Sequence, residues 1–484
     1  MIDQTSLELS LCLPTLGRRI ALISRWSALK TAAAMLLCLA TSIPSPAQTF
    51  ETLVSFDGAN GGNSYGGVVQ GTDGNLYGTT GSGGTRGSGT VFKVTTGGTL
   101  TTLHSFIGSD GAIPRAGLVQ GMDGGFYGTT WQGGAFGDGT FFKITAGGVF
   151  TVLYSFCAEA LCADGGGPVV ALVQGINGNF YGTNSGGGAY GYGTVFEMTP
   201  TGKLTTLNSF LGSPDGYGPI GSLLQDDNGT LYGTTFLGGT YDNGTVFKMS
   251  PTGEESILYN FCSQTNCSDG SWPEAALILG ANGSFYSTTS QGGSIGVGTV
   301  FELTGQGKLT TLYNFGAVGG NPVSPLVLGT DGNFYGTVLN GDEGIIEISS
   351  AGELKNLHSF TGTDGSNPYA GLLQDTNGTF YGTTLYGAND SCETGCGTVF
   401  SLATGLGPFV QTRPTSGKVG AKVIILGTNL AGTTAVGFNG TAATFTASNS
   451  AIQTTVPAGA TTGTITVNTP TGTLSSNVAF RVRP

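Results

Sequence analysis

The phrase DGNLYGTT at Asp73–Thr80 decides the fold, because six close variants of it follow along the same chain. Each variant keeps the order of a turn, an apolar residue, a tyrosine and small residues. The tyrosines, which stand about 50 residues apart, are Tyr77, Tyr127, Tyr181, Tyr232, Tyr286, Tyr335 and Tyr381. This period fits one blade of a β-propeller better than a helical repeat unit.

The second repeat shows how each unit divides into strands. Residues 116–121, 126–134, 139–145 and 149–156 alternate apolar and polar side chains, and no segment keeps a helical period. Asp-Gly and Gly-Gly dipeptides separate the strands, which suits hairpin turns with positive φ. These turns also account for much of the glycine content, 88 of 484 residues. We therefore predict an all-β protein built on a seven-bladed β-propeller.

The order of the repeated phrases also predicts how the propeller closes. The third-strand phrase occurs seven times and ends with GTVFSLA at Gly397–Ala403. The fourth-strand phrase also occurs seven times, but its first copy, at Thr49–Phe56, precedes any complete repeat. The last blade thus lacks an outer strand of its own, and we expect the N-terminal strand at Thr49–Phe56 to complete it.

The repeat resembles the Gloeobacter/Verrucomicrobia-type tandem repeat of bacterial exported proteins. The resemblance rests on DGNLYGTT, on the pattern GGxxGxGTVFK and on LTTLHSF. It implies export and little defined biochemistry. The sixth repeat departs from the pattern, because LNGDEGIIEI at Leu339–Ile348 is shortened. We assign residues 48–404 to the propeller.

Residues 405–484 resemble an IPT/TIG domain. The matching phrases are PTSGKVGAKVIILGTNL, VGFNG and TVPAGATTGTITV. The resemblance implies a small immunoglobulin-like β-sandwich that serves as a spacer or a binding accessory. Short alternating strands without cysteine or tryptophan agree with that fold.

Residues 1–47 have the pattern of a signal peptide, with four basic residues, a short apolar run and the small residues Ser45-Pro46-Ala47. We expect the mature chain, which has no transmembrane segment, to be secreted, periplasmic or associated with the cell surface. Cleavage removes four of 17 basic and two of 29 acidic residues, which leaves 13 and 27 and a formal net charge of −14. This charge argues against a nucleic-acid partner, because the phosphate backbone requires a basic face.

Six cysteines of the mature chain fall in three close pairs: Cys157 with Cys162, Cys262 with Cys267, and Cys392 with Cys396. In an exported chain, this spacing predicts three local disulfides. A metal site is the alternative, but the spacing is not C-x-x-C and no histidine stands nearby in the sequence. We therefore predict disulfides and no metal site at these cysteines.

The sequence offers no catalytic motif. His104 and His358 stand in the fourth strand, where other repeats carry valine, asparagine or tyrosine, so we interpret both histidines as structural. No nucleophile elbow, zinc-protease motif or phosphate-binding loop occurs. We name no catalytic residue.

One loop face combines carboxylates with aromatic residues. The loops between repeats carry D-G-x-x-P, with the acidic residues Asp110, Asp164, Asp215, Asp269 and Asp364. The glycine-rich loops emerge on the same side, and the aromatic residues of this face include Trp131, Tyr190, Tyr192, Tyr241, Trp272, Tyr369 and Tyr386. One interpretation is structural: each aspartate caps its own turn and the aromatic rings fill gaps between blades. The other is a binding face, where the rings stack on sugars and the carboxylates bind hydroxyl groups or Ca²⁺.

The leading hypothesis is an exported binding protein whose ligand is a carbohydrate or a cell-surface protein. One alternative is a polysaccharide-cleaving or lyase-type propeller enzyme, which would need paired carboxylates on this face. The other is a purely architectural protein of the cell envelope. Apart from Ca²⁺, no cofactor is expected.

Overall fold

The computed structural model describes residues 48–316, 319–341, 344–388, 392–393 and 395–484. The predicted signal peptide lies outside these residues. Within them, all regular structure is β-strand except for two 3-10 turns, η1 (Ala160–Cys162) and η2 (Thr265–Cys267). No helix in the described ranges is long and apolar enough to cross a membrane. The predicted all-β class is confirmed.

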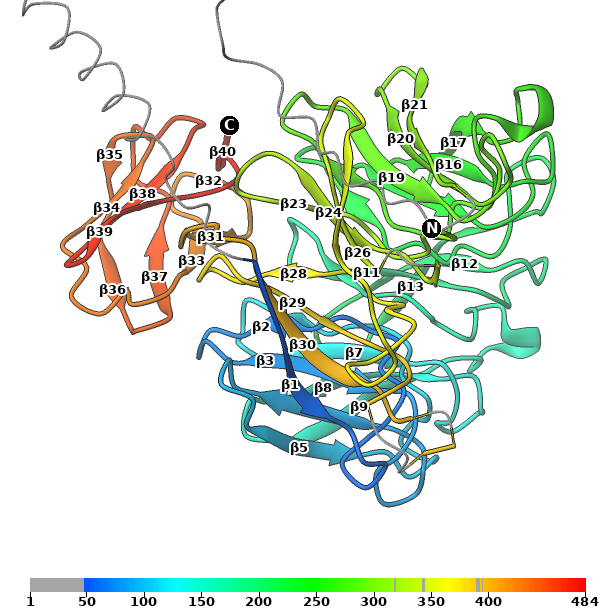
Figure 1. Ribbon diagram of the computed structural model, residues 1–484, viewed down its shortest axis with the longest axis horizontal. Helices are drawn as coiled ribbons and strands as arrows, with labels where there is room; N and C mark the ends of the chain where they lie inside the picture. Colours follow the sequence, from blue (N-terminus) through cyan, green and yellow to red (C-terminus); the bar gives the residue numbers. More distant parts are fainter. Residues whose placement is uncertain (1–47, 317–318, 342–343, 389–391, 394) are drawn as a thin grey trace, which may run out of the picture. The chain divides into compact units, whose positions relative to one another are not determined.

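The repeats fold into four-stranded antiparallel sheets, and seven such sheets follow one another through residues 49–403 (Figure 1). The first is β2 (Val69–Gln70), β3 (Leu76–Thr80), β4 (Thr90–Val94) and β5 (Leu100–Ser105); the second is β6 (Val119–Gln120), β7 (Phe126–Thr130), β8 (Thr140–Ile144) and β9 (Phe150–Ser155). The third is β10 (Val173–Gln174), β11 (Phe180–Asn184), β12 (Thr194–Met198) and β13 (Leu204–Ser209); the fourth is β14 (Leu224–Gln225), β15 (Leu231–Thr235), β16 (Thr245–Met249) and β17 (Glu255–Asn260). The fifth is β18 (Ile278–Leu279), β19 (Phe285–Thr289), β20 (Thr299–Leu303) and β21 (Leu309–Asn314); the sixth is β23 (Val327–Leu328), β24 (Phe334–Thr337), β26 (Ile345–Ile348) and β27 (Leu354–His358), beside a small pair of β22 (Gly319–Gly320) with β25 (Asn340–Gly341). In each of these six sheets, strands that follow in the sequence are also neighbours in space.

The seventh sheet combines the two ends of the repeat region. It contains β28 (Leu373–Gln374), β29 (Phe380–Thr383) and β30 (Thr398–Ala403), and its outer strand is β1 (Thr49–Ser55). β1 runs antiparallel to β30, with Thr49 opposite Ala403 and Ser55 opposite Thr398. Figure 1 shows β1 in blue beside β30 in orange. The predicted pairing of the N-terminal strand with the last repeat is confirmed.

Contacts around the repeated tyrosine explain why its phrase recurs. The Tyr77 hydroxyl donates to the Asp73 carboxylate at 2.8 Å, and the Lys93 ammonium donates to the same oxygen at 3.0 Å. Asp73 also accepts the backbone N–H of Asn75, which closes the turn before β3. Glycine follows the tyrosine because a Cβ at Gly78 would lie 2.5 Å from an adjacent phenylalanine ring. The phrase therefore specifies a turn, a buried tyrosine and a close strand pair together.

The apolar cores of the repeat region lie between successive sheets. One cluster packs Tyr77 of the first sheet against Phe126 of the second, and five further clusters join the second sheet to the third and so on to the seventh. Another cluster packs residues of β1 and β30 against residues of β3 and β4, so it joins the last sheet to the first. The Thr383 hydroxyl crosses the same junction and donates to the Gly66 carbonyl at 3.2 Å. Burial of these side chains is the main force that holds the sheets together.

The tail after β30 contains two further four-stranded sheets, ordered β31-β33-β37-β36 and β35-β34-β38-β39, and a parallel pair of β32 with β40. Their bounds are β31 (Gln411–Arg413), β32 (Ser416–Lys418), β33 (Lys422–Leu426), β34 (Ala435–Phe438), β35 (Thr441–Ala442), β36 (Phe445–Ala447), β37 (Ala451–Thr455), β38 (Ile465–Thr469), β39 (Gly472–Ser475) and β40 (Arg481–Arg483). One apolar cluster, which includes Val423, Phe438 and Phe480, fills the space between these strands.

Candidate functional site

A cavity of about 380 Å³ is lined by equivalent residues from all seven repeats. In each repeat the residue stands four positions before the innermost strand, and one position after a buried proline or, in the first repeat, after Ser64. We call this set the seven lining residues: Tyr65, Arg115, Val169, Ile220, Glu274, Val323 and Tyr369. Because the D-G-x-x-P loop ends at this proline, the cavity lies beside the loop face that the sequence analysis identified.

The backbone turns sharply just before each lining residue. Two positions earlier, φ is positive in every repeat: Asn63, Ile113, Gly167, Gly218, Trp272, Asn321 and Asn367 have φ between 52° and 65°. Asparagine and glycine accept this conformation readily, whereas a β-branched or bulky residue is strained in it. Ile113 and Trp272 are therefore held in place by the surrounding structure, and such strain is concentrated at functional sites.

Arg115 is stacked on aromatic rings. Its Cζ lies 3.7 Å from the centroid of the Trp131 ring and 5.2 Å from that of the Tyr65 ring. Its Nε is buried and has no acceptor among the described residues. Stacking of this kind holds the plane of the guanidinium and leaves its N–H edge for a ligand.

Glu274 brings the opposite charge to the cavity. Its carboxylate accepts a hydrogen bond of 2.6 Å from the Ser290 hydroxyl, and burial raises the pKa of Glu274 above the ordinary value despite that bond. The pKa of Tyr369 is also raised, first by burial and then by the charge of Glu274, while Arg115 opposes the shift. The Tyr65 and Tyr369 rings lie edge to face at 5.8 Å. The cavity thus combines one cation, one carboxylate, aromatic rings and an aliphatic wall.

The tail lies at the other end of the innermost strands. Arg413 donates to the backbone carbonyl of Gln70 at 3.0 Å and to the side-chain oxygen of Gln120 at 3.3 Å. Gln70 and Gln120 end β2 and β6, whereas Tyr65 and Arg115 precede the same strands. Burial lowers the pKa of Arg413 to about 10. Arg413 and the cavity therefore occupy opposite ends of these strands.

The predicted aspartates bond within their own loops. Asp164 and Asp269 are fully buried, and each accepts hydrogen bonds from two backbone N–H groups of its own loop. Each also accepts a tyrosine hydroxyl, from Tyr154 at 2.8 Å and from Tyr259 at 2.7 Å. These contacts are those of the capping interpretation, and neither carboxylate lines the cavity.

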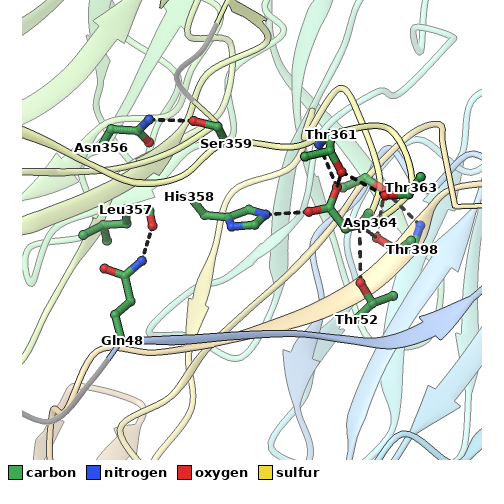
Figure 2. A network of polar contacts seen from close by, with 11 residues as sticks. Gln48, Thr52, Asn356, Leu357, His358, Ser359, Thr361, Thr363, Asp364 and Thr398 are labelled. Atoms are coloured by element: carbon green, nitrogen blue, oxygen red, sulfur yellow. Dashed lines mark hydrogen bonds and ion pairs between the residues drawn. The ribbon is translucent and has the colours of Figure 1, made fainter.

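Asp110 and Asp364 contact a histidine side chain where Asp164 and Asp269 accept a tyrosine hydroxyl. Nε2 of His104 and of His358 lies 2.9 Å from the respective carboxylate. Figure 2 shows Asp364 between His358 and Thr361. The backbone N–H and the hydroxyl of Thr361 both donate to the Asp364 carboxylate. The contacts agree with the structural interpretation of both histidines.

Asp215 differs from the other four aspartates, because asparagine replaces the tyrosine or histidine at Asn208. Its carboxylate accepts the backbone N–H of Leu211 at 3.0 Å, and burial raises its pKa. Tyr190 lies beside it along a shallow hollow of the surface. None of the five aspartates belongs to the lining of the cavity in the described part of the chain.

The predicted aromatic residues separate into two groups. Trp131 lines the cavity, whereas Trp272 does not belong to the lining and its ring packs against that of Phe236 at 5.1 Å. Tyr190, Tyr192 and Tyr241 project from the outer loops, with 59%, 44% and 48% of their surface exposed. The backbone of Tyr386 pairs with Ser366 in the last repeat. The structure therefore brings Trp131 and Tyr369 together and keeps the outer tyrosines apart from them.

The three predicted disulfides are present, between Cys157 and Cys162, Cys262 and Cys267, and Cys392 and Cys396. The first two hold the loops that Asp164 and Asp269 cap. The loops at the rim of the repeats are thus braced both covalently and by buried carboxylates.

Arg115 and Glu274 were missed by the sequence analysis. The signal that could have found them is a comparison of the repeats with one another. The residues around this position are small or apolar in every repeat, whereas the position itself carries tyrosine, arginine, valine, isoleucine or glutamate. Variation inside an otherwise constant pattern marks a position that the fold does not constrain.

The fold and the cavity define a class of protein: a tandem-repeat β protein whose repeats contribute equivalent residues to one cavity. The sequence profile of the Gloeobacter/Verrucomicrobia repeat matches residues 40–175 and 168–400, and the chain belongs to this family. The predicted family is confirmed. No curated protein matches the sequence.

Solved structures with a similar course of the chain include those of two bacterial proteins. One is the extracellular domain of a protein assigned to the hybrid two component systems of B. thetaiotaomicron. The two chains are 13% identical with a TM-score of 0.48, and the match covers 80% of this chain and 46% of that chain. The other is PorZ, a surface component of the type-IX secretion system of Porphyromonas gingivalis. The two chains are 18% identical with a TM-score of 0.47, and the match covers 89% of this chain and 61% of that chain. The chain spans about half to three fifths of the length of these proteins.

Proposed function

We propose that the chain is a seven-bladed β-propeller, closed by β1 and followed by an immunoglobulin-like tail of the IPT/TIG type. Support for the propeller comes from the seven sheets and from the clusters that join each sheet to the next and the last to the first. Support for the tail comes from its two four-stranded sheets around one core. The domains are then residues 48–404 and 405–484.

The protein acts outside the cytoplasm in this proposal. Three disulfides in short loops are typical of proteins that fold in an oxidising compartment. The signal peptide predicted for residues 1–47 would deliver the chain there.

Its function is to bind a carbohydrate in the cavity, without catalysis. The observation that carries this proposal is that the cavity lining includes an equivalent residue from each of the seven repeats. This residue differs in size and charge between repeats, whereas the residue after it is always glycine, alanine, valine or serine. A rigid repeated scaffold that presents variable side chains to one cavity is the arrangement expected of a binding site.

The chemistry of the lining favours a sugar over a flat protein surface. Tyr65 and Tyr369 offer aromatic rings for stacking on the apolar face of a sugar, while the Trp131 ring holds Arg115. Glu274 and Arg115 offer an acceptor and donors for hydroxyl groups. Glycoside hydrolysis by the usual route requires two carboxyl groups, and the cavity lining of the described residues includes one.

A glycan array tests this function with the mature chain from Gln48 and two double variants. We expect Tyr65→Ala/Tyr369→Ala to lose glycan binding with an unchanged unfolding temperature, because these rings line the cavity. The matched control, Tyr190→Ala/Tyr241→Ala, removes two exposed rings of the outer loops and is expected to bind as the native chain does.

Loss of binding in the control alone would move the site to the outer loops. A native chain that binds no glycan would contradict the carbohydrate proposal and favour a surface-protein ligand or an architectural role. Repeating the array with EDTA tests the predicted role of Ca²⁺ at the loop carboxylates, since a calcium-dependent site would lose its signal.

A further inference from the structure

Arg115 is the only basic residue that lines the cavity in the described part of the chain. One face of its guanidinium is covered by Trp131, and its Nε is buried without an acceptor. The ion pairs among the described residues do not include Arg115. The cavity therefore holds a cation that no carboxylate of the described residues neutralises at short range.

Because Nε is enclosed by the protein, a ligand can bond to Arg115 only at the two terminal amino groups of the guanidinium. The planar fork of a guanidinium matches a carboxylate, which can accept two parallel hydrogen bonds from it. Because Trp131 occupies one face of Arg115 and Nε is enclosed, the end of the fork, with its two terminal amino groups, is the part that remains for such a pair of bonds. A carboxylate satisfies this end better than a neutral hydroxyl group does.

The remaining lining limits what can carry the carboxylate. Tyr65 and Tyr369 favour a ring with an apolar face, and Glu274 with Ser290 favours hydroxyl donors. The volume of about 380 Å³ is near the lower end of the range for small-ligand sites. The formal charge of −14 outside the signal peptide disfavours a long polyanion, since the exterior repels it.

We propose that Arg115 binds the carboxylate of a uronic acid, so that the cavity takes an acidic sugar at the end or on a branch of a saccharide. This inference rests on the proposed carbohydrate-binding function and names the ligand class of the same cavity. In it, the sugar ring packs against Tyr65 and Tyr369, and its hydroxyl groups donate to Glu274.

The test uses short glycans that end in glucuronic or galacturonic acid, each beside a neutral counterpart in which CH₂OH replaces the carboxylate. Calorimetric titration of the mature chain with cellobiouronic acid and cellobiose gives the same comparison in solution. We expect at least one acidic glycan to bind about tenfold more tightly than its neutral counterpart. Arg115→Gln is expected to remove this preference, and Arg115→Lys to keep part of it.

Arg86→Gln is the matched control, because Arg86 is exposed and lies outside the cavity lining. Equal binding of acidic and neutral glycans by the native chain would overturn the uronic acid inference and leave the carbohydrate function standing. A native chain that binds neither kind would overturn both. An acidic preference that survives in a folded Arg115→Gln variant would place the recognition elsewhere. If Arg115→Gln does not fold, the native comparison and Arg115→Lys still decide.

Discussion

Replacement of Glu255 by leucine is expected to stabilise the protein in a pH-dependent way. Glu255 is the first residue of β17, the outer strand of the fourth sheet. The equivalent residues of the other six sheets are apolar: Phe50, Leu100, Phe150, Leu204, Leu309 and Leu354. Glu255 therefore places a carboxylate where the fold otherwise places a hydrocarbon side chain.

The surroundings of Glu255 give only partial compensation. Asn208 donates a hydrogen bond to one carboxylate oxygen, while the other oxygen is buried without a donor among the described residues. Burial raises the pKa of Glu255 to about 7, and the charge of Asp215 adds to the shift. In the unfolded chain the pKa returns to the ordinary value near 4.5.

The sign of the effect follows from this difference in pKa. Below about pH 4.5 the group is protonated in both states and the folded state has no penalty. As the pH rises from there to about 7, the unfolded state ionises first and the folded state loses stability. Above pH 7 the loss is complete and amounts to roughly 3 kcal/mol, because each pKa unit corresponds to about 1.4 kcal/mol.

Urea unfolding of the mature chain, with disulfides intact, measures this loss at about pH 4.5 and about pH 8. Glu255→Leu gains apolar burial at both pH values. The effect of the carboxylate is therefore the increase, from about pH 4.5 to about pH 8, in the difference in unfolding free energy between the variant and the native chain. We expect that increase to be about 2–3 kcal/mol. Glu254→Leu, at the exposed neighbouring residue, is expected to show no such increase. An advantage of Glu255→Leu that is the same at both pH values would refute the reasoning.

The remaining predictions address closure, the repeated turn and the disulfides. A chain that begins at Asp57 lacks β1, and we expect its unfolding, followed by circular dichroism, to lose cooperativity. An added β1 peptide is expected to restore folding. An unaffected chain would contradict the role of β1 in closure. Asp73→Asn is expected to lower the free energy of unfolding by about 0.5 kcal/mol by removing the partner of Lys93. Adding Lys93→Glu to this variant should recover the lost free energy of unfolding, because the third repeat pairs asparagine with glutamate at the same positions. No recovery would show that the two residues do not act as a unit. Cys157→Ser/Cys162→Ser should speed proteolysis of its loop and cost at most about 2 kcal/mol, whereas a global loss of folding would mean that the bond does more than hold the loop.

The fold could be predicted from the sequence because its signals are local and repeated. The turn at Asp73, the tyrosine after it and the glycine at Gly78 act within a few residues, and seven copies of the same pattern reinforce one another. The pairing of β1 with β30 followed from comparing the order of the repeated phrases, which needs no distance information.

The cavity could be predicted only in part. Trp131 and Tyr369 were identified because aromatic residues in loops stand out, but Arg115 and Glu274 come from different repeats and meet only when the sheets are assembled. The loop aspartates show the opposite case. Their recurrence is equally visible in sequence, but it cannot reveal that Asp164 and Asp269 are buried against their own backbone.

The position of the seven lining residues has a consequence for how proteins of this family diverge. Each lining residue stands two positions after the residue with positive φ and outside the apolar clusters between sheets, so its substitution leaves those clusters intact. Duplication of a repeat supplies a complete structural unit, and one codon in that unit then sets its share of the cavity wall. Under the proposed binding function, specificity in such a chain is modular: a new ligand preference can evolve one repeat at a time, without a compensating change in the other six.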